Sequence, residues 1–199
     1  MSDDGSASPA AVLRSIVARA VDCDPAGLGD RTAIVERASG SANGADEPEG
    51  SPTPVGRLAE LIGGSDSVVA VVPRFDADLA GRLNASLSAG DEAHESGAAD
   101  DATAPSEGRV VFTGSAADRL TGTTGAVVRR ALADRGVDAY RHEGESPIAV
   151  VLTDDRAAVG LIDGAGVAAL LWTRDAAVRE WAAATCRRYL DAAEPVADG

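Results

Sequence analysis

The residues best placed to do chemistry follow two apolar runs that read as strands. Arg74 comes just after the run of residues 68–72, and Thr113, Gly114 and Ser115 close a second run. In open sheets with parallel strands, ligands bind at the carboxyl ends of the strands, where helix N-termini offer unpaired amides. A guanidinium and a hydroxyl together suit a phosphate or a carboxylate. We therefore expect these four residues to bind a ligand, unless Arg74 only balances surface carboxylates and Ser115 only caps a helix.

The sequence contains no recognisable catalytic or metal-binding pattern. It has no Lys, and His142 is followed by Glu143 and Gly144, which excludes a His-x-Lys motif. It also lacks a nucleophile elbow, a dinucleotide-binding glycine pattern and a Cys or His pair at zinc spacing. Cys23 and Cys186 lie far apart in the sequence, so we expect two reduced thiols. The sequence therefore predicts no catalytic residue, no metal and no cofactor.

The charge balance is unusual. The chain of 199 residues carries 18 basic and 32 acidic side chains, for a net charge of −14, and every basic residue is Arg. Such a surface suits a cytoplasm rich in salt, because the Debye length falls to roughly 3 Å at molar salt and the self-repulsion is screened. A GC-rich genome would give the same composition. We expect a halophilic, acidic protein that makes no direct contact with nucleic acid.

The sequence also predicts where the protein resides. The N-terminus lacks the basic start and apolar stretch of a signal peptide, and no apolar run reaches the ~18 residues of a membrane span. We therefore expect a cytoplasmic protein without membrane contact.

The chain divides at stretches of small and acidic residues. Residues 1–37 are expected to hold one amphipathic helix, over 9–22, and a short strand over 32–35. Residues 38–53 are rich in Gly, Ser, Pro and acids and read as a flexible linker. We expect residues 54–199 to form an α/β sensor-like domain, interrupted by an acidic disordered loop over 88–108.

The first half of that domain alternates helices and strands. A short helix over 55–62 precedes the apolar run of residues 68–72, which fits a strand covered on both faces. Phe75 opens a set of apolar residues four apart that predicts a second helix, followed by a strand over 109–113 and a helix that stops at Gly136. This order predicts parallel pairing with right-handed crossovers.

The last third reads as four successive strands and a closing helix. The turns between the strands are too short to hold a helix, which predicts an antiparallel meander over 137–141, 148–153, 157–162 and 167–172. Trp172, Trp181 and Tyr189 are expected to be structural core residues rather than ligand-stacking ones. The predicted fold class is therefore α/β: a mixed sheet with an N-terminal parallel strand-helix part and a C-terminal antiparallel meander closed by a helix.

The same residues carry a family resemblance. The helix ending in ADRGVDAY, the hairpin SPIAVVLTDDRAAVGLID, the strand GVAALLWT and the final pattern W-x7-Y-x3-A-x-P resemble the effector domain of haloarchaeal transcriptional regulators. The likeness is to the FilR-type domain and to the similar sensor domains of TbsP-like and TrmB-like regulators, over about residues 68–196. It implies a metabolite-sensing or protein-contact module that accompanies a winged-helix DNA-binding domain. We recognise no winged helix in this sequence.

Together these features predict a non-enzymatic sensor or protein-interaction module. It would act through a small-molecule effector, a protein partner or a homodimer. Two alternatives stay open: a small-molecule enzyme with an unrecognised site, and a regulator that binds DNA directly through its N-terminal helix.

The charge predicts that folding depends on salt. Screening of like charges stabilises a chain of net charge −14 whose Ala-rich core opposes their repulsion only weakly. The melting temperature measured by circular dichroism should therefore rise between 0.1 and 3 M KCl (about 10 to 2 Å of screening length). An unchanged melting temperature over this range would contradict the halophilic interpretation.

Overall fold

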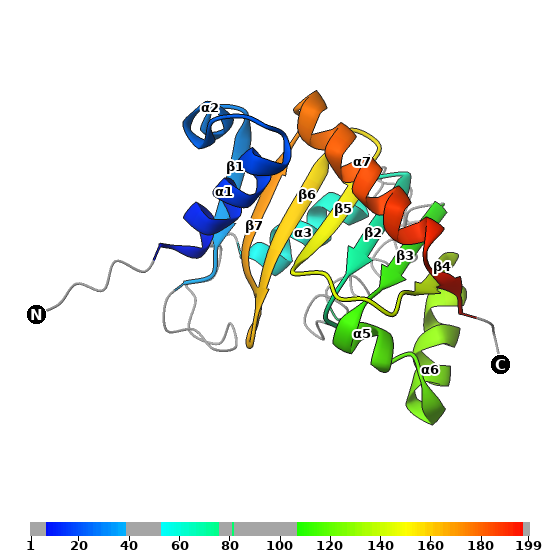
Figure 1. Cartoon of the computed structure of the whole chain (residues 1–199). Coiled ribbons are helices and arrows are strands. Elements are labelled where there is room, and N and C mark those ends of the chain that lie inside the picture. Colours follow the sequence, from blue (N-terminus) through cyan, green and yellow to red (C-terminus); the bar gives the residue numbers. More distant parts are fainter. Residues whose placement is uncertain (1–6, 39–52, 76–80, 82–106, 197–199) are drawn as a thin grey trace, which may run out of the picture.

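One mixed β-sheet organises the protein (Figure 1). The computed structural model describes residues 7–38, 53–75, 81 and 107–196. Within these ranges the sheet has eight strands in the order β1-β7-β6-β5-β2-β3-β4-β8. Helices α1 and α7 lie on one face of the sheet and α3 on the other, which makes three layers.

The central strands β2, β3 and β4 run parallel. β2 (Ser67–Val72) aligns Val71 with Val111 of β3 (Glu107–Phe112), and β3 aligns Val111 with Tyr140 of β4 (Val137–Arg141). The expected parallel part is therefore confirmed. The single helix expected between β3 and β4 is instead two, α5 (Gly114–Asp118) and α6 (Gly122–Ala133).

An antiparallel set of strands completes the sheet. β5 pairs with β2 and β6, and β7 pairs with β6 and β1, all antiparallel. The predicted fold class, a mixed sheet with a parallel part and an antiparallel meander closed by a helix, is confirmed. The elements are β5 (Ile148–Thr153), β6 (Ala157–Asp163), β7 (Gly166–Thr173) and the closing helix α7 (Ala176–Asp191).

The expected place of residues 137–141 in the meander is wrong. β4 pairs with β3, and β2 and β3 separate it from β5. The connection over 142–147 crosses the ends of these two strands, a distance of about 14 Å at ~4.8 Å per strand. Six extended residues span about 20 Å, so a link too short for a helix is still long enough for this crossing. Beyond β4 lies β8 (Glu194–Pro195), a short edge strand that the sequence did not suggest.

The segment before the predicted linker adds to the same sheet. α1 (Pro9–Ala20) starts after Ser8, whose side chain accepts from the Ala11 amide, and α2 (Pro25–Gly29) follows it. β1 (Thr32–Glu36) is the edge strand beside β7. Most of the predicted linker over 38–53 lies outside the described residues, so the division of the chain there stays a prediction.

Three clusters of buried side chains hold the layers together, the third of them beneath α5 and α6. On one face α1 and α7 cover Val71, Val111, Val150 and neighbouring strand residues. On the other, α3 (Pro54–Gly63) covers Val68 and further small apolar residues. The strand over 68–72 alternates between these clusters, which explains its unbroken apolar sequence.

The aromatic residues expected in the core lie at its margins. Trp181 and Tyr189 are half-buried and pack from α7 against the first cluster. Trp172 is also half-buried and packs against the second cluster, with the Arg57 guanidinium 4.8 Å from its ring centroid. Their structural role stays a prediction.

Two sequence predictions concern residues that are not fully described. The helix expected after Phe75 and most of the acidic loop over 88–108 lie outside the described residues. The loop's predicted end is wrong, because β3 already begins at Glu107. In the part of the chain that is described, no helix is both long and apolar enough to cross a membrane.

Because α1 packs on the sheet, its buried face should be needed for stability. Leu13 is fully buried in the first cluster, and Leu13→Ala should lower the free energy of unfolding by about 2–5 kcal/mol. Val12, on the same helix, is 37% exposed, and Val12→Ala should cost less than about 1 kcal/mol. Urea denaturation of both variants measures the difference. Equal, small losses would show that the fold does not depend on α1.

Candidate functional site

The chain itself covers the carboxyl ends of β2 and β3, where a ligand was expected. The crossing segment of residues 142–147 lies over these ends. The Gly114 amide donates to the Gly144 carbonyl oxygen at 3.2 Å, and the Ala116 amide donates to the Pro73 carbonyl oxygen at 3.3 Å. The Gly114 and Ala116 amides at the start of α5 therefore already have protein acceptors.

Thr113 and Gly114 form the floor beneath this segment. Thr113 is fully buried, and its Oγ1 has no hydrogen-bond partner. Gly114 has a φ of +50°, where a side chain would be strained, and a Cβ there would meet the Pro73 carbonyl oxygen at 3.4 Å. Ser115 follows within α5 and is exposed. The floor thus contains one buried hydroxyl that is free to donate.

Contacts with β3 and α7 hold the crossing segment in place. The His142 amide donates to the Phe112 carbonyl oxygen at 2.9 Å, and the His142 Nδ1 accepts from the Gly144 amide at 2.9 Å. The His142 ring meets the edge of Tyr189, with 4.9 Å between ring centroids. The Tyr189 hydroxyl donates to the Glu145 carbonyl oxygen at 3.4 Å, a long bond.

Arg74 does not join the other three predicted residues. Its Nη1 donates to the Asp163 carbonyl oxygen at 3.0 Å, at the turn between β6 and β7. Arg37 forms an ion pair with the Asp163 carboxylate. The Asp163 cluster therefore brings together two guanidinium groups and one carboxylate. Sequence reasoning missed Arg37, because it lies at the predicted linker, far from Arg74 in sequence.

The groups around Asp163 lower the pKa of its carboxyl group. Burial raises the pKa of Asp163, but hydrogen bonds from Arg37 and the Ala165 amide and the two positive charges outweigh this effect. The pKa of Asp163 therefore lies below its ordinary value, and the carboxylate stays charged at neutral pH. Its hydrogen bonds make it a structural link between β1, β2 and the β6–β7 turn.

A second acidic contact lies at the opposite end of the strands, where β2 begins and β5 ends. Asp154 accepts from the Asp66 amide at 2.7 Å and from the Ser67 hydroxyl at 2.6 Å. The hydrogen bond from the Ser67 side chain is the main reason that the pKa of Asp154 is lowered. Asp155 pairs with Arg174 and Arg156. These acids are used within the fold, and the described residues contain no group of three or more potential metal ligands.

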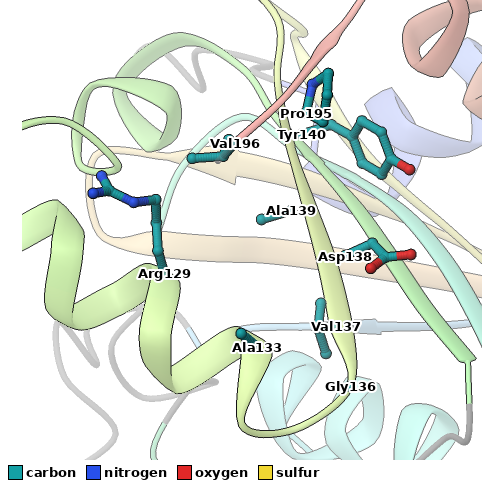
Figure 2. Close-up of a pocket in the computed structure, with 9 residues that line it drawn as sticks. All are labelled: Arg129, Ala133, Gly136, Val137, Asp138, Ala139, Tyr140, Pro195 and Val196. Atoms are coloured by element: carbon teal, nitrogen blue, oxygen red, sulfur yellow. The ribbon is translucent and has the colours of Figure 1, made fainter. Parts of the chain in front are cut away.

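A cavity of about 420 Å³ lies at the edge of the sheet that β4 and β8 form, between α6, β4 and the chain after α7 (Figure 2). Sequence reasoning did not find it, because its walls combine residues far apart in the chain. Its lining residues are Arg129, Ala133, Gly136, Val137, Asp138, Ala139, Tyr140, Pro195 and Val196.

The family comparison assigns this α/β fold to a regulatory class of domain. The family described as "Methanogenesis regulatory protein FilR1, middle domain" matches residues 52–192, more than two thirds of the chain. The chain belongs to this family, and the FilR-type resemblance of its sequence is confirmed. No curated protein matches the chain.

A solved structure supports the same fold. TrmBL2, whose structure is described as that of an archaeal chromatin protein with a novel mode of DNA binding, matches with a TM-score of 0.51 and 11% identity. The match covers 83% of this chain and 54% of that chain. This chain therefore spans about half the length of TrmBL2, and at this identity the likeness shows the fold alone.

The two cysteines should differ in reactivity. Both are free, Cys23 is half-buried, and burial of Cys186 between α7 and the sheet raises its pKa to about 12. Because only the thiolate reacts, we expect Ellman's reagent at pH 8 to label Cys23 in the folded protein and Cys186 only after unfolding. In Cys23→Ser the fast reaction should disappear. Fast labelling of that variant would contradict the burial of Cys186.

Proposed function

We propose that this chain is a non-enzymatic sensor module of a transcriptional regulator, which responds to a small-molecule effector or a protein partner. Membership of the FilR1 middle-domain family over residues 52–192 carries the proposal. The described residues support it, since Asp154, Asp155 and Asp163 are used in structural contacts. The alternative of an enzyme needs acids or nucleophiles that these residues do not bring together.

For the effector we propose the carboxyl ends of β2 and β3, at Thr113, Gly114 and Ser115. Arg74, the fourth predicted residue, would contact the effector after releasing the Asp163 carbonyl oxygen. The crossing segment of residues 142–147 occupies this place through hydrogen bonds of 3.2 Å from the Gly114 amide and 3.4 Å from the Tyr189 hydroxyl, besides the 2.9 Å bond from the His142 amide to β3. An effector oxygen would replace the Gly144 carbonyl as acceptor for the Gly114 amide, and would also accept from the unpartnered Thr113 hydroxyl. Binding would then displace the segment and its contact with Tyr189 on α7.

This proposal is tested with the full chain and a metabolite extract at high salt. A sensor should retain a small molecule that is recovered unchanged, as judged by mass spectrometry. Thr113→Val should reduce retention, because it removes the free hydroxyl. Thr185→Val is the matched control, since Thr185 is also buried but lies on α7. A product that forms only with the chain present would overturn the non-enzymatic proposal.

The protein-partner form has its own test. Pull-down from cells at native salt should recover either a DNA-binding regulator or a second copy of this chain. Light scattering of the purified protein then distinguishes a homodimer from a complex with another protein. A monomer that recovers no partner would limit the proposal to a small-molecule effector.

We further propose a cytoplasmic protein that does not bind duplex DNA by itself. The chain carries a net charge of −14, and contact with DNA phosphates requires a basic face. Fluorescence anisotropy with promoter fragments at physiological ionic strength should show no submicromolar binding. Tight binding that weakens steeply with salt would favour the alternative of a direct DNA-binding regulator.

A further inference from the structure

The cavity between α6 and β4 has the size and walls of a small-molecule site. Its volume of about 420 Å³ falls within the range of roughly 300–1,000 Å³ that is common for ligand pockets. Its lining joins the apolar side chains of Ala133, Val137, Ala139 and Val196 to a larger polar surface that includes Arg129 (Figure 2). A charged donor beside a few apolar side chains suits a small amphipathic ligand.

The walls come from the alternation of side chains along β4. Ala139 packs in the cluster beneath α5 and α6, whereas Tyr140 packs on the opposite face beside α7. Figure 2 shows Asp138 and Tyr140 directed away from Arg129. The Asp138 carboxylate is therefore on the other side of the strand from the guanidinium and does not neutralise it.

Arg129 is held in place by the fold. Its Nη1 donates to the Leu120 carbonyl oxygen at 2.6 Å, at the turn between α5 and α6. Gly125 allows this close packing, because a Cβ at residue 125 would lie 2.3 Å from the Leu120 carbonyl carbon. The guanidinium is thus fixed at one nitrogen before any ligand binds, which lowers the entropic cost of using the others.

The other edge of the guanidinium has no acceptor among the described residues and does not reach the cavity surface in this conformation. The Arg129 Nε is buried and has no hydrogen-bond partner, and Arg129 forms no ion pair with any described residue. Nε and Nη2 form the side of the guanidinium that takes both oxygens of a carboxylate. A small rotation of the side chain about its Leu120 contact would present this edge to the cavity.

We propose that this cavity binds a compact monocarboxylate with a short apolar body. The carboxylate would pair with Arg129, and the apolar body would lie against Ala133, Val137, Ala139 and Val196. A free phosphate would satisfy Arg129 but leave the apolar walls in contact with water. The proposal is independent of the effector site at the carboxyl ends of β2 and β3, because the two sites share no residue.

Isothermal titration of the full chain in 2 M KCl with 3-methylbutyrate tests the proposal. We expect saturable binding, with 3-methylbutyramide and inorganic phosphate at least about tenfold weaker, since each lacks one of the two interactions. Arg129→Met should weaken 3-methylbutyrate binding about tenfold. Arg130→Met is the matched control, because its neighbouring side chain is 86% exposed, and it should bind like the wild type.

A second variant distinguishes lost binding from a folding defect in Arg129→Met. Ala133→Leu keeps the arginine but fills the cavity, and should also weaken binding while the circular dichroism spectrum stays unchanged. No binding to the wild type up to 100 mM (~1.4 kcal/mol at the 1 M standard state), or equal binding of acid and amide, would overturn the proposal. Thr113→Val should bind 3-methylbutyrate normally, so failure here is distinguishable from failure of the proposed effector site.

Discussion

The scarcity of large apolar side chains constrains the whole structure. Aromatic residues make up 3% of the chain, and Ala is its most frequent hydrophobic residue. A stable core then requires that the few Val, Leu and Ile residues be covered from both sides. Full burial of one such side chain contributes only about 1.5–3 kcal/mol to the free energy of unfolding. The central strands meet this condition, with α1 and α7 on one face and α3 on the other. Residues such as Val71 and Leu170 are almost fully buried as a result.

Local patterns were enough to predict most elements of this fold. The bounds of the strand over 148–153 follow from turn chemistry that acts over a few residues. Pairing is different, because it depends on the path of the whole chain. The strand over 137–141 was placed in the meander since its following link is short, yet the preceding helix α6 puts it parallel to β3. The two-residue strand β8 is too short to produce any pattern.

The residues of the candidate sites are even harder to predict from local sequence patterns than the pairing of the strands. Thr113 and Gly114 were found because the end of a buried strand is visible in sequence, but nothing local indicates that residues 142–147 cover them. Arg74 was grouped with Ser115 by topology, whereas the structure directs it to Asp163 and Arg37. The cavity beside β4 combines Arg129 with Val196, which no spacing rule connects. Side-chain direction, rather than element position, decides which residues meet.

The edge strand β1 has a consequence for how the chain folds. It lies outside the residues that match the FilR1 family, yet Thr173 of β7 donates to the Arg31 carbonyl oxygen across 142 residues of chain. The entropy of closing so long a loop grows only with the logarithm of its length. Changes in the length of the intervening segments therefore alter the stability of this edge little. The chain between β1 and the regulatory domain can accordingly be lengthened or shortened at little cost in free energy.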